Sequence, residues 1–99
     1  MDDLFDLSGK IAVITGGSRG LSRQMALAFA QRGADIVIAS RKLDACEDVA
    51  KEVEALGRRA LPVALDASKW DDVGAFADRI YDEWGRIDIL VNNAGKSPA

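Results

Sequence analysis

A run of glycines interrupted by a serine and an arginine is the part of this sequence best suited to hold an anion. It reads Thr15-Gly16-Gly17-Ser18-Arg19-Gly20-Leu21-Ser22. The β-branched run before it is typical of a buried strand, and the apolar residues after it follow helical spacing. At such a helix start, unpaired backbone N–H groups and the positive end of the helix dipole face one point, and glycine admits a phosphate without a Cβ in the way. The segment therefore predicts a bound nucleotide.

Two further kinds of turn contain glycines of this sort. A P-loop fits less well, because it requires Gly-Lys-Ser/Thr after the turn and here Gly20 is followed by Leu21 and Ser22. The second is a tight connection that holds no ligand. Against it, the turn has the expected strand and helix around it and a second strand at the expected distance.

Ser40 and Arg41 bear on which dinucleotide would bind. In related βαβ units that bind NAD, an acid closes the second strand and accepts a hydrogen bond from the ribose 2′-hydroxyl. Here that position is Ser40, and Arg41 follows. A guanidinium holds a 2′-phosphate with two parallel hydrogen bonds, and Arg19 can approach the same phosphate. These residues favour NADP over NAD, with solvated surface arginines as the alternative.

Asp66 closes the third predicted strand at the same edge of the sheet. Its carboxylate suits two roles that are compatible with each other. It can accept a hydrogen bond from an adenine amino group, or it can cap the helix that begins near Ser68. Ser68 and Asp71 themselves predict a capping box at that helix start.

Strands and helices alternate along the chain. Strands are predicted at residues 11–14, 36–39, 60–65 and 87–91. Each of the three intervening helical patterns ends at a glycine suited to a left-handed C-cap, namely Gly33, Gly57 and Gly85. The residues expected to face the core are Leu21, Met25, Ala28 and Phe29 in the first helix, Leu43, Cys46, Ala50, Val53 and Leu56 in the second, and Val73, Phe76, Ala77, Ile80 and Trp84 in the third.

This β-α-β-α-β-α-β order predicts an α/β fold, a Rossmann-like doubly wound parallel sheet with the strand order 3-2-1-4. Pro62 lacks an N–H group and suits an edge strand, which agrees with the third strand lying outermost. Ligands bind such sheets at the carboxyl ends of the strands, where the direction of winding reverses. The glycine run and residues 92–95, Asn-Asn-Ala-Gly, both fall there.

Composition limits the class of protein. A chain of 99 residues that is 48% hydrophobic suits one domain, residues 1–99. A net charge of −3 with dispersed acids argues against a nucleic-acid partner, and no apolar run suits a signal peptide or a membrane span. We therefore expect a cytoplasmic protein. Histidine is absent and Cys46 is the single cysteine, so neither a metal site nor an internal disulfide is expected.

Three motifs together resemble the short-chain dehydrogenase/reductase family: the Thr-Gly-Gly-Ser-Arg-Gly run, Asp66, and Asn-Asn-Ala-Gly, the most specific of them. The resemblance extends from Leu7 to Pro98. It implies an oxidoreductase that transfers hydride between NADP(H) and a carbonyl or alcohol substrate. Asn93 is expected to tie the fourth strand to the first, although both asparagines could instead form a turn that satisfies its own backbone. The resemblance implies cofactor contacts by Gly16, Ser18, Arg19, Gly20, Leu21, Asp66, Ala67, Asn92, Ala94 and Gly95.

The sequence departs from the family pattern at Ser22, where the family usually has glycine. Overpacking by the added Cβ and hydroxyl would cost about 1–3 kcal/mol, so we expect weaker cofactor binding than in a Ser22→Gly variant. The family's chemistry uses a tyrosine four residues before a lysine, with an upstream serine. Tyr81 is the sole tyrosine and Gly85 follows it four places on. No catalytic residue is therefore assigned, and the catalytic groups are expected beyond Ala99.

The chain is thus interpreted as the cofactor-binding portion of such an enzyme, truncated after the fourth strand and inactive alone. The alternatives are a dinucleotide-binding module without chemistry and a truncated product without function. The fourth strand would leave an uncovered edge, so self-association or a homo-oligomer is expected. Cys46, Trp70, Tyr81 and Trp84 are interpreted as packing residues.

Overall fold

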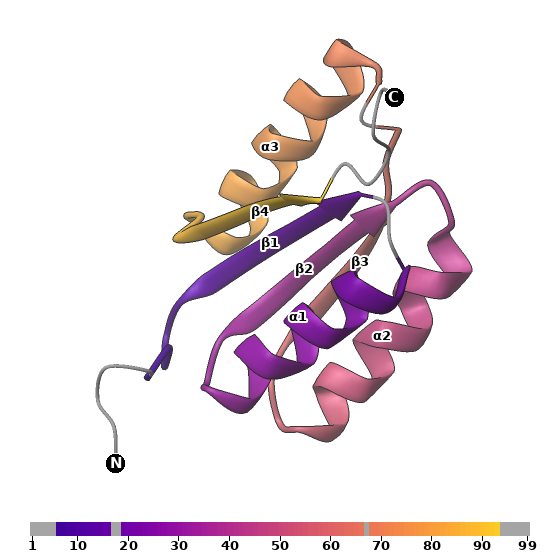
Figure 1. The fold of residues 1–99 in the computed structure, drawn as a ribbon. Helices are drawn as coiled ribbons and strands as arrows, with labels where there is room; N and C mark the ends of the chain where they lie inside the picture. Colours follow the sequence, from indigo (N-terminus) through magenta and orange to yellow (C-terminus); the bar gives the residue numbers. More distant parts are fainter. Residues whose placement is uncertain (1–5, 17–18, 67, 94–99) are drawn as a thin grey trace.

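The computed structural model describes residues 6–16, 19–66 and 68–93. A four-stranded parallel sheet has the order β3-β2-β1-β4, as the sequence predicted (Figure 1). Helices α1 and α2 cover one face of the sheet and α3 lies on the other (Figure 1). The strands are β1 (Ile11–Gly16), β2 (Asp35–Ser40), β3 (Ala60–Ala64) and β4 (Ile89–Asn93), and the helices are α1 (Arg19–Gln31), α2 (Leu43–Ala55) and α3 (Trp70–Trp84).

Strands β1 and β2 form the centre of the core because they are buried on both faces. Their side chains alternate between the two layers. Ala12, Ile14, Ile36 and Ile38 pack under α1 and α2. Ile11, Val13, Val37 and Ala39 pack with Phe76 and Ile80 of α3. A continuous apolar run is the pattern expected of a strand covered by helices on both sides.

Strand β3 forms one edge of the sheet, and Pro62 lies in it opposite Ile38. The N–H of Leu65 donates to the Ser40 carbonyl over 2.8 Å. Since N–H groups alternate in direction along a strand, position 62 faces away from β2, where the missing N–H of proline breaks no ladder bond. The edge-strand prediction is confirmed. The third strand ends at Ala64, one residue early, and the fourth is shifted to Ile89–Asn93 from the predicted 87–91.

The buried face of α1 differs from the predicted one. Ser22, Ala26 and Ala30 face the sheet, whereas Leu21 is 46% exposed and Ala28 lies on the surface. Residues four apart share one helix face, and small side chains there let the helix approach the sheet closely. Met25 and Phe29 flank this contact and are partly buried.

The other two helices follow the prediction at their centres and depart from it at their ends. Cys46, Ala50 and Val53 of α2 are buried, joined by Val49, while Leu43 and Leu56 are exposed because the terminal turns extend beyond the sheet. In α3, Phe76 and Ile80 are buried as expected and Trp84 packs against them.

Two aromatic residues of α3 do not pack as predicted. Trp70 is 87% exposed and Tyr81 is 53% exposed. Both lie off the stripe formed by Phe76 and Ile80, so the prediction that they pack in the core is wrong.

The helix ends confirm the glycine predictions and overturn the capping box. Gly33, Gly57 and Gly85 all have positive φ, and the Gly85 N–H closes α3 on the Tyr81 carbonyl over 3.0 Å. At the other end, α3 starts at Trp70 with Lys69 as N-cap and no side-chain cap bond. The Ser68 hydroxyl instead donates to Asp66, one turn before the helix. No helix among the described residues could span a membrane.

Candidate nucleotide-binding site

The carboxyl ends of the four parallel strands lie at one edge of the sheet (Figure 1), and the described part of the predicted site lies at these strand ends. Strand β1 ends at Gly16 and pairs with β4, which places Thr15 beside Asn92. Strand β2 ends at Ser40, opposite Ala64 of β3. Four predicted contacts, Ser18, Ala67, Ala94 and Gly95, lie outside the described residues.

Strand β1 ends at Gly16, and helix α1 begins at Arg19. Gly16 has φ +97°, a conformation that residues with a Cβ rarely adopt. A Cβ added at Gly20 would meet nothing within 4 Å, so space lies over the backbone at the helix start. The first turn of α1 carries no acidic residue that would repel an anion. These features fit a phosphate at this helix N-terminus.

Ser22 lies in the first turn of α1 and is 5% exposed. Its hydroxyl donates to the Gly16 carbonyl over 3.4 Å. The side chain that replaces the family glycine is therefore accommodated between α1 and the end of β1, with its polar atom hydrogen-bonded. Leu21, the neighbouring predicted contact, is exposed on the outer side.

A side-chain hydrogen bond joins the ends of β1 and β4. The Thr15 hydroxyl donates to Asn92 Oδ1 over 3.2 Å, and Thr15 is 7% exposed. Sequence reasoning assigned the link between these strands to Asn93, which lies opposite Gly16 in the ladder. The described side chain that forms it is Asn92, which accepts through Oδ1. Thr15 was missed, although a polar residue ending a buried strand is a usable signal.

The turn between β2 and α2 carries Arg41 between two fixed residues. Ser40 Oγ accepts a hydrogen bond from the Lys42 N–H over 3.2 Å and lies 3.2 Å from Cys46 Sγ. Arg41 is exposed. Lys42, which sequence reasoning did not consider, is the N-cap residue of α2 and makes no side-chain cap bond.

Asp66 lies beside this turn, because the preceding Leu65 N–H donates to the Ser40 carbonyl. The Asp66 carboxylate accepts from the Ser68 N–H over 3.0 Å and from its hydroxyl over 2.6 Å. These bonds lower the pKa of the Asp66 carboxyl, and the charges of Lys69 and Arg41 lower it further. Asp66 is thus an ionised acceptor that braces the loop before α3 rather than the N-cap of that helix.

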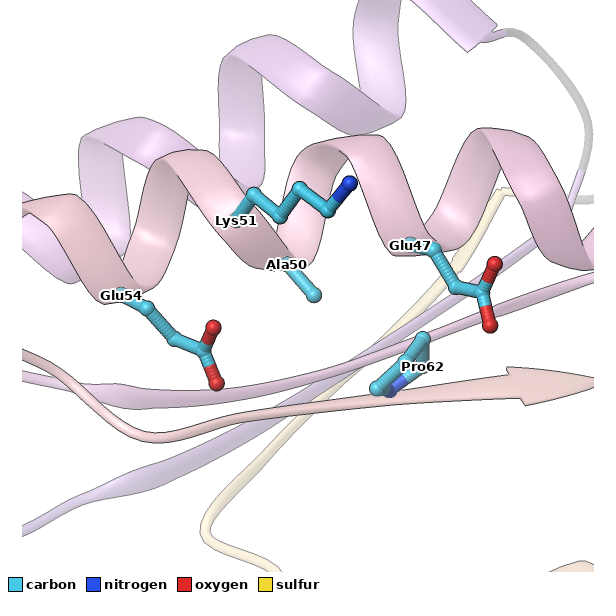
Figure 2. Close-up of a pocket in the computed structure, with 5 residues that line it drawn as sticks. All are labelled: Glu47, Ala50, Lys51, Glu54 and Pro62. Atoms are coloured by element: carbon cyan, nitrogen blue, oxygen red, sulfur yellow. The ribbon is translucent and has the colours of Figure 1, made fainter.

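A shallow hollow of about 340 Å³ lies elsewhere, between α2 and the edge strand β3 (Figure 2). Glu47, Lys51 and Glu54 project from α2 around it, and Pro62 forms its opposite side. Two carboxylates and one ammonium group make poor partners for a phosphate. Among the described residues, no three potential ligands gather into a metal site.

The family model for short chain dehydrogenases matches residues 10–99. The chain belongs to this family. It is 48% identical over 91 residues to the 2-dehydro-3-deoxy-D-gluconate 5-dehydrogenase of Escherichia coli K12, a match that covers 92% of this chain and 35% of the relative. It is 47% identical over 93 residues to an uncharacterised oxidoreductase of Mycobacterium tuberculosis, covering 94% and 35%.

Solved structures of this short-chain family agree with the fold. The L-sorbose reductase of Gluconobacter frateurii, complexed with NADPH and L-sorbose, is 41% identical with a TM-score of 0.85, over 93% of this chain and 35% of that one. A Pseudomonas aeruginosa RhlG/NADP complex is 37% identical with a TM-score of 0.87, over 99% and 39%. The chain spans about 35% of the length of the curated relatives named above, and corresponds to the N-terminal part of this oxidoreductase family.

Proposed function

We propose that this chain binds NADP(H) at the carboxyl edge of its sheet and forms the nucleotide-binding part of a short-chain oxidoreductase. The start of α1 carries the proposal. It combines a left-handed Gly16, open space over Gly20 and a first turn without acids, all at the reversal of winding between β1 and β4. Arg19, Leu21 and Asn92, together with Ser18, Ala94 and Gly95 outside the described residues, complete the proposed contacts along the dinucleotide.

We propose NADP rather than NAD as the preferred form. Ser40 stands where an acid would repel a 2′-phosphate, and Arg41 follows it on the surface beside Asp66. Arg41 is exposed and acts on the nearby Asp66 carboxylate through its charge, and we propose that its guanidinium takes the phosphate. Solved relatives bound to NADPH and NADP support this choice. Asp66, with Ala67 outside the described residues, is proposed to contact the adenine.

The reaction proposed for the whole enzyme is hydride transfer between NADP(H) and a small carbonyl or alcohol substrate. The cofactor supplies the hydride, and the residues of this chain bind and orient it. Tyr81 is exposed on α3, and the residue four positions after it is Gly85 rather than the lysine of the family's tyrosine–lysine pair. We therefore propose that the 99-residue chain binds the cofactor without catalysing the reaction.

Calorimetric titration of the chain with NADPH and with NADH tests the binding proposal. We expect saturable binding of both and tighter binding of NADPH, with the preference lost in Arg41→Ala. Arg79→Ala, which removes a surface arginine paired with Glu83 on α3, is the matched control and should keep the preference. Absence of binding, or tighter binding of NADH, would overturn the proposal.

A dinucleotide-binding module without chemistry is the second candidate, because Tyr81 is not followed by lysine four residues on. The two are distinguished by the parent reading frame after Ala99. A serine followed by Tyr-x-x-x-Lys supports the enzyme, whereas an immediate stop codon supports the module.

We also propose that the 99-residue chain self-associates through the outer edge of β4. Asp88 donates its backbone N–H to the Ile11 carbonyl, so by alternation the N–H groups of Ile89 and Val91 face away from β1. Leu90, on the α3 side of the sheet, is 64% exposed. Unpaired N–H groups and apolar surface together favour strand pairing with a second copy.

A further inference from the structure

The turn that carries Arg41 is held from inside the protein. Ser40 is the last residue of β2, and its carbonyl is fixed to β3 by the Leu65 N–H over 2.8 Å. Its side chain turns inward, where Oγ lies 3.2 Å from the Sγ of Cys46 in the first turn of α2. Cys46 is 2% exposed. Solvent therefore does not compete for the thiol that Ser40 contacts.

The same hydroxyl fixes the residue on the other side of Arg41. Ser40 Oγ accepts the Lys42 N–H over 3.2 Å, and the Cys46 N–H donates to the Lys42 carbonyl over 3.2 Å. Lys42 supplies no cap bond of its own to α2. Ser40 thus holds the Lys42 N–H while Cys46 closes the first turn of α2 on the Lys42 carbonyl, and Arg41 lies between Ser40 and Lys42.

Cys46 is tied in turn to the edge strand. Its thiol donates to the Val63 carbonyl over 3.8 Å, which is long but within the range for sulfur. Ser40, Cys46 and Val63 therefore link the end of β2, the start of α2 and β3 at one point. These three residues are named the β2–α2 anchor. No other described residue connects these three elements beneath Arg41 through side-chain hydrogen bonds.

We propose that Cys46, acting through Ser40, is a positioning residue for recognition of the 2′-phosphate. This inference rests on the NADP(H) function proposed above. A bidentate guanidinium contact depends on orientation, and holding the Arg41 backbone in place reduces the ordering cost of binding the phosphate. NADH lacks that phosphate, so loss of the anchor weakens NADPH binding and leaves NADH binding nearly unchanged. The readout is the ratio of the two dissociation constants rather than either one alone.

The test compares substitutions at Cys46 with a matched core substitution one turn away. Cys46→Ala removes the contact to Ser40, and we expect the NADPH preference to fall about threefold to tenfold, the range for one hydrogen bond. Cys46→Ser keeps a group that donates and accepts, so the preference should return to within about twofold of the natural chain. Val49→Ala truncates another buried α2 residue, 5% exposed, and should lower the thermal midpoint without changing the preference.

A double-mutant cycle decides whether Cys46 acts through Ser40. If it does, Cys46→Ala adds little to Ser40→Ala, and the two losses of preference are not additive. Additive losses, or an unchanged or higher preference in Cys46→Ala, would overturn the inference while Arg41→Ala still abolishes the preference. If the natural chain shows no preference for NADPH, the proposed NADP(H) function fails first and the role of Cys46 fails with it.

Discussion

Arginine and carboxylate side chains occur at both ends of the sheet, but among the described residues at the strand ends they form ion pairs with each other only at the amino end. At the amino end, Asp35 is bound by Arg58 and Arg59, and the Arg59 guanidinium lies 4.2 Å from the Trp84 ring centroid. At the carboxyl end, Arg41 has no ion pair with a described residue. Charged groups at the amino end form ion pairs with one another. At the carboxyl end, Arg41 acts on the Asp66 carboxylate through its charge, and we propose that Arg41 meets the ligand.

A second carboxylate, that of Asp88, accepts hydrogen bonds at the amino end of the sheet. Asp88 Oδ2 accepts from the Ile11 N–H over 2.9 Å and from Arg86 Nε over 2.8 Å, while Arg86 also donates to the Gly9 carbonyl. The starts of β1 and β2 are thus joined by side chains to the residues just before the neighbouring strands β4 and β3. By contrast, the described side-chain bonds at the carboxyl end that involve Thr15, Ser22 and Ser40 measure 3.2–3.4 Å. Stability and binding are therefore expected to respond to different substitutions.

Asp35→Asn should have the largest effect on stability. The Asp35 carboxylate is 10% exposed and serves two arginines and the Arg59 N–H, so neutralising it lowers the free energy of unfolding by about 2–3 kcal/mol. Urea denaturation followed by circular dichroism measures the loss. Asp78→Asn, on the exposed surface of α3, is the control with an expected change near zero. Equal effects of the two substitutions would contradict the comparison, and the NADPH preference should change in neither.

Low pH should also lower the free energy of unfolding, because it protonates the carboxylates at the amino end of the sheet. Burial raises the pKa of the Asp35 carboxyl, but the Arg59 hydrogen bonds and the two arginine charges outweigh it and hold that pKa below its ordinary value. Hydrogen bonds from Arg86 and Ile11 lower the pKa of Asp88. A lowered folded-state pKa stabilises the fold above the unfolded value, about 3.9, and that contribution is lost as the pH falls through the folded value.

The urea midpoint should consequently decrease from pH 5 toward pH 3, and less steeply in Asp35→Asn than in the natural chain. An identical pH dependence in both chains would show that Asp35 does not carry this effect.

Leu90→Lys tests a region that belongs to neither end. A charge on the open β4 edge should raise the dissociation constant for self-association about tenfold, since it removes one apolar contact and adds like-charge repulsion. Sedimentation velocity measures it. Tyr81→Lys, which also places a lysine at an exposed aromatic position, is the control. A chain that is monomeric at all concentrations would show that the β4 edge does not pair.

Ser22→Gly should have the smallest effect, at the carboxyl end alone. Removing the buried Cβ relieves packing behind the turn, but it also removes the hydrogen bond to Gly16, so we expect only a few-fold tighter binding of NADPH and NADH alike. Ala26→Gly, on the same face of α1, should weaken the helix without this gain. Calorimetry compares the two, and equal or tighter binding by the natural chain would refute the expectation.

Short sequence patterns predicted most of the fold, because strands, helices and their ends leave recognisable patterns within a few residues. The glycine helix ends and the edge preference of Pro62 each depend on a few consecutive residues, and the strand order follows from the alternation of strands and helices with right-handed crossovers. The buried face of α1 was missed because Ser22, Ala26 and Ala30 are small, and the periodicity of larger apolar residues indicated another face. Trp70 was assigned to packing by residue type, although its position sets its exposure.

The sequence predicted which residues of the candidate site stand at strand ends. It did not predict the hydrogen bonds that these residues make. Gly16, Ser40 and Asn92 follow from strand ends, whereas the bonds Thr15–Asn92 and Ser40–Cys46 depend on side-chain rotamers set by packing. The sequence did not predict the Asp35–Arg59 pair, because the two residues are 24 positions apart and no local pattern relates them. Side-chain contacts between residues of different helices, strands and loops can be identified only when the packing of those elements is known.

Backbone amide chemical shifts, recorded during titration of the chain with NADPH, test most directly whether the carboxyl edge is the nucleotide site. We predict that the amides of Gly20, Leu21 and Arg41 shift until saturation, while those of Asp35 and Asp88 do not. Shifts confined to the amino end, or none at NADPH concentrations that saturate the calorimetric signal, would contradict the account.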